Sequence, residues 1–319
     1  VLREIYTEDF IYTVDGKYYF SPINFDLKMN KLNSANFSKN SDGEITYSEN
    51  GAVVSHKGID ISRYQGNIDF SKVKQSGVEY AIIRCGYRGY SGGTITDDSS
   101  FDTYMRDALS NDIKVGAYFF SQALTKDEAV EEADYVISKL KPYNVTCPVA
   151  IDVEEVNAGS SRQNTLTNEA LTDTVIAFCD RIKEAGYTPM IYANSRYFAG
   201  KLDMSRLEDY EKWYAFYADV PYMPYEFSMW QYTNTGSVDG ISGNVDLNIS
   251  FKSSLPHAYP SCSSISGVCL CVPTPYAFML SFTSQKRLAT FAPLPAPEVP
   301  LFASIIIVSG SISPSFTIG

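Results

Sequence analysis

Three carboxylates stand close together in VAIDVEEV, which covers residues 149–156. In a β-strand, residues i and i+2 lie on the same face, so Asp152 and Glu154 share a face if the strand runs through Glu154, while Glu155 lies on the other. Two such carboxyl groups can divide general acid–base work, because a desolvated acid keeps its proton while one held by donors stays ionised. The spacing indicates acid-catalysed chemistry, although Asp-x-Glu triplets also occur on surfaces and at helix N-termini.

Two further acids occur singly inside apolar runs. Asp60 lies between isoleucines in GIDIS (58–62), and Asp246 lies between a valine and a leucine in NVDLNI (244–249). A solvated surface explains them poorly, since aspartate is rarely buried without a partner. We expect both side chains to join the first two acids at one site.

Aromatic and amide side chains occur near the ends of similar apolar runs. Tyr118 lies in GAYFFS, Tyr192 in IYA, and both Trp230 and Gln231 in FSMWQY. Aromatic faces stack on sugar rings, and amide or phenol groups hydrogen-bond hydroxyl and acetamide groups. Each aromatic residue taken singly is expected in the core. Together with four acids, these residues indicate a carbohydrate-binding cleft.

The elements that must position these residues begin at Gly58, where apolar runs start to alternate with amphipathic stretches. Eight runs have the composition of strands: 58–62, 79–84, 114–120, 147–152, 188–193, 213–218, 227–232 and 244–249. The longer helix candidates are 101–112, 126–141 and 167–186. Helices become sparse after Ala193.

Alternating strands and helices imply an α/β fold with a mostly parallel sheet covered by helices. Eight is the number of strands that closes a barrel. A doubly wound open sheet is the alternative, although the chain has no glycine-rich first turn to hold a dinucleotide. In a parallel barrel the carboxyl ends of the strands form the active face, which is where we expect the acids.

The two ends of the chain differ from this pattern. The alternating run FIYTVDGKYYF around Asp15 and Gly16 predicts a small hairpin, and the Asn-, Ser- and Gly-rich stretch 31–50 predicts a linker. Residues 253–319 are rich in proline and serine and nearly uncharged, so we expect a disordered or non-native tail. The chain is therefore divided into an extension (1–57), a catalytic barrel (58–252) and a tail (253–319).

Composition excludes several classes of function. With 45% hydrophobic residues and a net charge of -11, the 319-residue chain is typical of a globular protein and lacks the basic face of a nucleic-acid binder. The two histidines, His56 and His257, leave little material for a Ser–His or Cys–His nucleophile or a histidine-rich metal site. Cys85, Cys147 and Cys179 are widely spaced, and we expect them to be buried thiols. We expect neither a metal nor a cofactor.

Ordered motifs in this pattern resemble the glycoside hydrolase family 25 lysozymes, also called Chalaropsis-type N-acetylmuramidases. The motifs are GIDISRYQGNIDFSKVKQSGVEYAIIRCGYRGY, GAYFFSQALTKDEAVEEADYV, PVAIDVEEV, TPMIYAN and MWQYTNTGSVDGISGNVDLN. They cover about Gly58 to Phe251. The resemblance implies an irregular TIM-like barrel of five β/α units followed by three strands, (β/α)5(β)3.

The resemblance also implies hydrolysis of the β-1,4 bond between N-acetylmuramic acid and N-acetylglucosamine in peptidoglycan. By this resemblance Glu154 matches the proton donor, Asp152 its neighbouring carboxylate, and Asp60 and Asp246 the other two acids of the cleft. Glu154 is expected to protonate the leaving oxygen and then deprotonate water. Asp152 is either the nucleophile or the group that orients the substrate's own acetamide, and the sequence leaves both open. Glu155 is expected to be dispensable.

Two other functions fit parts of the pattern. Family 18 chitinases also end a barrel strand on Asp-x-Glu, but they carry further acids upstream in that strand, which PVAID lacks. An inactive cell-wall-binding barrel is the non-enzymatic alternative. We expect a monomer that acts on bacterial cell-wall peptidoglycan, outside the cell, at the wall, or as a phage-type lysin. No signal peptide is visible, and no stretch is long enough to span a membrane.

Overall fold

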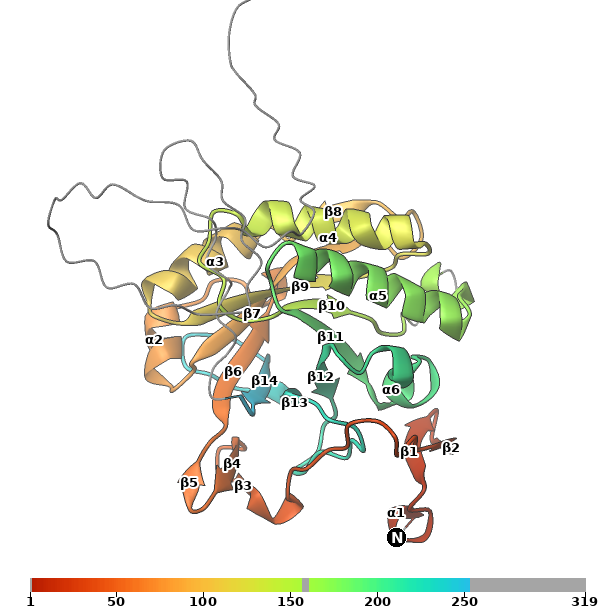
Figure 1. The fold of residues 1–319 in the computed structure, drawn as a ribbon. Helices are drawn as coiled ribbons and strands as arrows, with labels where there is room; N and C mark the ends of the chain where they lie inside the picture. Colours follow the sequence, from red (N-terminus) through yellow and green to blue (C-terminus); the bar gives the residue numbers. More distant parts are fainter. Residues whose placement is uncertain (1, 157–160, 253–319) are drawn as a thin grey trace, which may run out of the picture. The chain divides into compact units, whose positions relative to one another are not determined.

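A computed structural model of the chain describes residues 2–156 and 161–252, so the expected tail at 253–319 lies outside the described residues. Eight strands form the centre of the fold: β6 (His56–Ile61), β7 (Tyr80–Arg88), β9 (Lys114–Phe120), β10 (Val149–Asp152), β11 (Pro189–Asn194), β12 (Glu211–Ala215), β13 (Met229–Gly236) and β14 (Val245–Ser250). They are joined in the order β6-β14-β13-β12-β11-β10-β9-β7, and pairing of β6 with β7 closes the barrel (Figure 1). A short β8 (Ile95–Asp97) pairs with β7 outside the ring.

Five helices connect the first six barrel strands: α2 (Phe70–Gln75), α3 (Phe101–Ser110), α4 (Lys126–Leu140), α5 (Asn168–Glu184) and α6 (Ser195–Gly200). Thr125 and Thr167 fix where the two longest begin, because their side chains accept hydrogen bonds from Glu128 N and Ala170 N. After α6, only short helical turns such as η4 (Met204–Arg206) accompany β12, β13 and β14. The predicted (β/α)5(β)3 barrel is confirmed, and β14 runs antiparallel to both of its neighbours.

Strand alternation separates the inside of the barrel from its helix-covered outside. The inward side chains form one apolar cluster: Tyr80, Ile82, Cys147, Ala150, Met190, Trp213 and Met229. Gly58 is required where β6 meets this cluster, because a Cβ atom there would lie 2.1 Å from a ring carbon of Tyr80. The three predicted buried thiols are confirmed at Cys85, Cys147 and Cys179.

The extension is folded against the barrel. After α1 (Leu2–Ile5), the strands β1 (Asp9–Val14) and β2 (Lys17–Pro22) form an antiparallel hairpin. Its turn residues Asp15 and Gly16 have φ of 48° and 73°, as a tight hairpin turn requires.

The stretch 31–50 is not the linker that its polar composition predicted. It holds η1 (Ser34–Asn36), β3 (Phe37–Lys39) and β4 (Ile45–Glu49), and β5 (Ala52–Val53) completes a three-stranded sheet. Ile45 and Tyr47 alternate inward and are buried, and Phe37 packs edge-on against Trp230 of the barrel. A few apolar side chains at alternate positions are enough to anchor an otherwise polar segment.

Candidate active site

Four acids meet at the carboxyl end of the parallel strands. Asp60 of β6 and Asp152 of β10 point inward and are buried, and Asp246 of β14 is paired with Asp60 in the strand register. Strand β10 ends at Asp152, but Val153 N still donates to Tyr192 O at 3.1 Å, so the ladder continues by one residue. Glu154 follows and acts electrostatically on Asp152. The structure therefore brings together all four acids that the sequence indicated.

Asp60 and Asp246 form a hydrogen-bonded pair of carboxyl groups. Asp60 Oδ2 accepts hydrogen bonds from Gln231 Nε2 at 2.9 Å and Asn248 Nδ2 at 2.8 Å, and Asp246 is hydrogen-bonded to Asp60. Burial raises the pKa of Asp60, but the amide donors favour its charged form. Burial and the charge of Asp60 raise the pKa of Asp246 to about 9. These effects favour the protonated form of Asp246 within the pair.

Asp152 and Glu154 lie in a setting that favours protonated carboxyl groups. Burial raises the pKa of Asp152 well above its usual value, and the charge of Glu154 adds to the effect. Burial, followed by the charge of Asp60, raises the pKa of Glu154 as well. Arg84 opposes the rise at Asp152, but its guanidinium is already paired with Asp98 at 2.7 Å. Asp152 Oδ1 is buried without a hydrogen-bond partner among the described residues, which leaves it available to a substrate group.

The two amide side chains that donate to Asp60, Gln231 and Asn248, accept hydrogen bonds from phenol and indole groups. Tyr192 Oη and Tyr217 Oη donate to Gln231 Oε1 at 2.9 and 3.0 Å, and Trp213 Nε1 donates to Asn248 Oδ1 at 2.8 Å. Sequence analysis missed Trp213, Tyr217 and Asn248. Asn248 could have been found, because it lies two residues after Asp246 and therefore on the same strand face. Tyr217 lay near the end of the expected strand 213–218, but β12 ends at Ala215 and Tyr217 follows it in a loop.

The aromatic residues expected in the cleft divide into two groups. Tyr118 and Tyr192 point inward and pack edge-on against Trp213, with ring centroids 6.2 and 4.7 Å away. Trp230 does not join them: it is fully buried on the outer side of β13, where its Nε1 donates to Phe216 O at 2.7 Å. The reason is alternation, since neighbouring residues such as Trp230 and Gln231 face opposite sides of a strand.

A groove of about 480 Å³ opens beside the acids, and we call it the hairpin groove. Its barrel side includes Glu154 and Tyr192, and its other side is formed by the extension. The full lining is Arg3, Ile11, Tyr12, Thr13, Val14, Asp15, Glu154, Glu155, Tyr192, Asn194, Ser195, Arg196, Ala215, Phe216 and Tyr217. Glu155 forms an ion pair with Arg196 here, whereas no ion pair of Glu154 is found among the described residues.

The described residues contain no group of three or more His, Cys, Asp or Glu side chains placed to hold a metal ion. Within 2–156 and 161–252, no helix is long and apolar enough to cross a bilayer. Carboxyl groups placed as these four are can transfer protons and stabilise positive charge.

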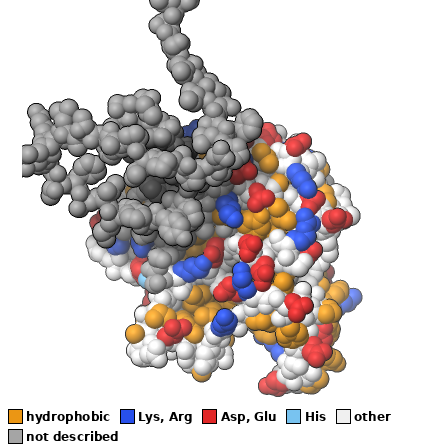
Figure 2. Space-filling model, in the orientation of Figure 1, with side chains coloured by type: hydrophobic (Ala, Val, Ile, Leu, Met, Phe, Trp, Pro, Cys, Tyr) orange, Lys and Arg blue, Asp and Glu red, His pale blue; other side chains and the backbone are white. Residues whose placement is uncertain are grey.

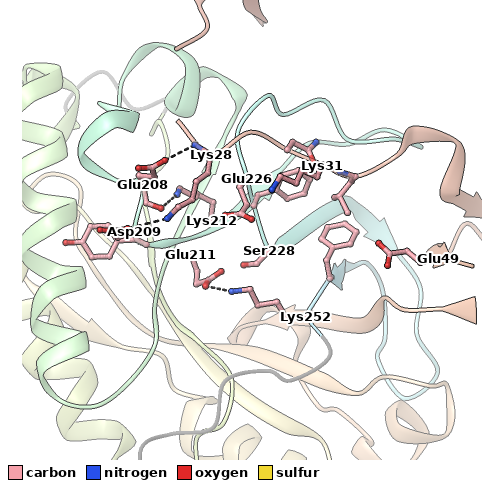
Figure 3. Close-up of a pocket in the computed structure, with 15 residues that line it drawn as sticks. Lys28, Lys31, Glu49, Glu208, Asp209, Glu211, Lys212, Glu226, Ser228 and Lys252 are labelled. Carbon is pink, nitrogen blue, oxygen red and sulfur yellow. Dashed lines mark hydrogen bonds and ion pairs between the residues drawn. The ribbon is translucent and has the colours of Figure 1, made fainter. Parts of the chain in front are cut away.

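A second cavity, of about 310 Å³, lies at the opposite end of the barrel, where β12 and β13 begin (Figure 3). Lysines and acids are paired there: Lys28 with Asp209 at 3.4 Å, and Lys252 with Glu211. The Lys28 backbone also donates to Glu208 Oε1 at 2.7 Å. This cavity marks a joint between the extension and the barrel rather than a site of proton transfer.

Comparisons with known proteins agree with this geometry. A family model for the glycosyl hydrolases family 25 matches residues 59–241, more than half of the chain. The chain is 31% identical over 193 residues to an autolytic lysozyme of Clostridium acetobutylicum, covering 60% of this chain and 55% of the relative. It is 29% identical over 204 residues to lysozyme M1 of Streptomyces globisporus, covering 60% and 66%. The chain thus spans less than two thirds of either relative.

Solved structures agree on the fold. A family 25 glycosyl hydrolase from Bacillus anthracis superposes with a TM-score of 0.53 at 23% identity, covering 67% of this chain and 95% of that one. At this level of identity the likeness concerns the fold alone. This likeness agrees with the barrel that the strand order shows independently.

Proposed function

Because the chain belongs to glycosyl hydrolase family 25, we propose that it cleaves the β-1,4 bond between N-acetylmuramic acid and N-acetylglucosamine in bacterial peptidoglycan, with Glu154 as the proton donor. The catalytic unit in this proposal is residues 58–252, with 1–57 as an extension. The enzyme acts as a monomer at the cell wall, either secreted or as a phage-type lysin. The names of its relatives support the substrate, since both are called lysozymes.

The observation that carries the proposal is the set of four acids at the carboxyl end of the strands, none of which has an ion pair among the described residues. A structural acid in a barrel is normally paired, because an uncompensated buried charge costs several kcal/mol. Here burial and the charge of Asp60 raise the pKa of Glu154 instead, which favours the protonated form that a proton donor needs. Glu154 is also the acid of the four that lines the hairpin groove, where a substrate chain has access.

The proposed reaction has two steps. Glu154 donates its proton to the glycosidic oxygen while the bond from that oxygen to the sugar C1 breaks. The leaving chain departs with a new hydroxyl group. A water molecule later attacks C1 as the bond between C1 and the acetamide oxygen that replaced the leaving chain breaks. The Glu154 carboxylate takes the proton of that water, which returns the enzyme to its starting state.

Asp152 is proposed to orient the acetamide of the cleaved sugar, whose carbonyl oxygen attacks C1 in the first step. Two observations favour this role over direct attack by Asp152. The pKa of Asp152 is raised well above its usual value, and a protonated carboxyl group is a poor nucleophile. Its Oδ1 is buried without a partner among the described residues and is free to accept an N–H donor. Asp60 and Asp246 set the charge around this pair.

Mass spectrometry of a purified peptidoglycan digest tests the function. After borohydride reduction, the proposed cleavage yields reduced N-acetylmuramic acid at the new ends. Reduced N-acetylglucosamine ends would identify a glucosaminidase, and new peptide ends an amidase, and either result would refute the proposal. Wall binding without new reducing ends would support the inactive barrel. Cleavage of chitin oligomers but not peptidoglycan would support the chitinase-like alternative.

A further inference from the structure

The hairpin groove joins the acid cluster to a part of the chain that lies outside the family match. Glu154 and Tyr192 line it from the barrel, and Tyr12, Thr13 and Asp15 line it from the hairpin. The family model begins at residue 59, so this wall is an addition to the matched barrel. A volume of about 480 Å³ is within the range of about 300–1,000 Å³ that ligand pockets show.

The hairpin is held in place beside the acids by specific contacts. Strand β1 lies against α6 (Figure 1), and Tyr12 Oη reaches Gly200 so closely that a Cβ atom there would lie 2.6 Å from it. Tyr222 Oη donates to Asp9 O at 3.0 Å, and Phe10 is buried edge-on against the Tyr222 ring. These contacts make the hairpin a fixed wall rather than a loose arm.

The chemistry of the groove suits an uncharged, hydroxyl-rich chain. Phenol, hydroxyl and amide groups line it at Tyr12, Thr13 and Asn194. Of its two arginines, Arg196 is paired with Glu155, and the Arg3 guanidinium lies 3.6 Å from the centre of the Tyr222 ring. The lining holds the three acids Asp15, Glu154 and Glu155 against these two arginines, so the groove does not favour a carboxylate of a stem peptide.

Aromatic side chains continue from the groove onto the outer surface of the hairpin. Tyr12 stacks on Tyr19 with ring centroids 5.5 Å apart. Tyr18, Tyr19 and Phe20 are 60%, 44% and 43% exposed, although large aromatic side chains seldom gather on a surface without a binding role. Hydrophobic side chains gather at the lower right of Figure 2, where Figure 1 places β1 and β2.

We propose that the hairpin groove is an additional subsite that binds the glycan strand of the substrate beyond the bond that is cleaved. The proposal rests on the proposed function, because it assigns the groove to the same polysaccharide. It assigns Tyr12 and the adjoining Tyr19 as the aromatic contacts to sugar rings. It predicts that the enzyme prefers long strands to short oligosaccharides.

The test compares substrate lengths in the full chain. Substrates are glycan strands freed of peptides, long or cut to tetrasaccharides. We expect Tyr12→Ala to lower kcat/KM on long strands by about tenfold, as loss of one stacking contact does, and on tetrasaccharides by less than about twofold. Tyr19→Ala, at an exposed position that tolerates change, lowers the long-strand value less. Phe25→Ala, another exposed aromatic residue of the extension that does not line the groove, leaves both values unchanged.

Three results would overturn the subsite. Equal losses on both substrate lengths would mean that Tyr12 and Tyr19 only support the fold. No loss with either variant would mean that the groove binds nothing. A loss seen only on strands that carry peptides would assign the groove to the stem peptide.

Binding separates this proposal from the proposed function. In the Glu154→Gln background, calorimetry with peptide-free long strands measures the groove without turnover. Addition of Tyr12→Ala is expected to weaken that binding about tenfold. If the wild-type protein releases no reducing ends but Tyr12→Ala still weakens binding in the Glu154→Gln background, the proposed function alone is refuted. Unchanged binding in an active enzyme would refute the subsite alone.

Discussion

Both ends of the barrel are rich in charged side chains, but the two ends differ in whether the acids are paired with cations. At the end shown in Figure 3, lysines accompany the acids, and Lys28 and Lys252 form ion pairs with Asp209 and Glu211. At the carboxyl end of the strands, four acids face one another, and the nearby Arg84 is paired with Asp98 instead. The Lys28–Asp209 ion pair joins the extension to the barrel, whereas the four acids have no ion pair among the described residues and their surroundings favour protonated carboxyl groups. The difference separates a structural joint from a site of chemistry.

The largest expected effect concerns Glu154. Removing its proton with Glu154→Gln is expected to lower kcat by about 10²–10⁴-fold, because general acid catalysis contributes that much. The measurement is release of reducing ends from peptidoglycan, with the melting temperature as a check on folding. Glu155→Gln is the matched control. Its carboxylate is paired with Arg196 and lines the groove, so we expect kcat to stay within about twofold and any change to appear in KM.

A comparable loss in the two amide variants would contradict this distinction. It would mean that the ion pair at Glu155 matters as much as the proton at Glu154. The lack of an ion pair would then not distinguish the catalytic acid from other acids of the groove.

Asp152 gives the next largest effect. Asp152→Ala is expected to lower kcat by about 10²-fold, because the buried acceptor that orients the reacting acetamide is lost. Substrate with the acetamide removed should be cleaved slowly by the wild type, and the variant should lose little more on it, since the two changes remove one interaction. Equal kcat on acetylated and deacetylated strands would rule out participation of the acetamide.

Asp246 is expected to lower the stability of the folded protein while supporting its activity. Its native pKa is about 9, above the unfolded value of about 3.9, so between these pH values the native state binds more protons. The free energy of unfolding therefore falls as pH rises through this window. Asp246→Asn should flatten the fall and stabilise the protein at pH 8 by about 1–3 kcal/mol, while lowering activity. Urea unfolding at pH 5 and pH 8 measures both slopes, and an unchanged pH slope would contradict the raised pKa.

The smallest effect is expected at the opposite end. Burial lowers the pKa of Lys212 to about 8, and its Nζ donates to Glu208 O at 2.8 Å. At pH 7 both native and unfolded forms are charged, so the native state bears the full cost of the buried charge. Lys212→Met should raise the free energy of unfolding at pH 7 by about 1–2 kcal/mol, and by less near pH 10. Activity is expected to be unchanged, and a loss of kcat would mean that the two ends are coupled.

Most of the barrel could be predicted because its signals are local. Apolar runs of strand length fixed all eight barrel strands, and the absence of long amphipathic segments after Ala193 predicted the three final strands. The inward direction of Asp60, Asp152 and Asp246 followed from acids inside apolar strands. These features depend on neighbours within a few residues, which the sequence displays directly.

What could not be predicted depends on contacts between distant segments. The hairpin lies more than a hundred residues before Glu154, yet both line one groove. The stretch 31–50 has the composition of a linker, but Ile45 and Tyr47 are buried. Trp230 was expected in the cleft, although its neighbour Gln231 occupies the inward position of that strand. Which face of a strand is inward depends on pairing, and pairing is a property of the whole barrel.

Titration of the carboxyl groups by carbon NMR tests the central claim most directly. Protein labelled at the glutamate and aspartate side-chain carbons is followed from pH 3 to pH 10, and the Glu154→Gln and Asp246→Asn variants assign the two signals. The account predicts that Glu154 stays protonated at pH values where exposed glutamates have ionised, and that Asp246 titrates near pH 9. Titration of both groups at the usual values of about 4 would contradict it.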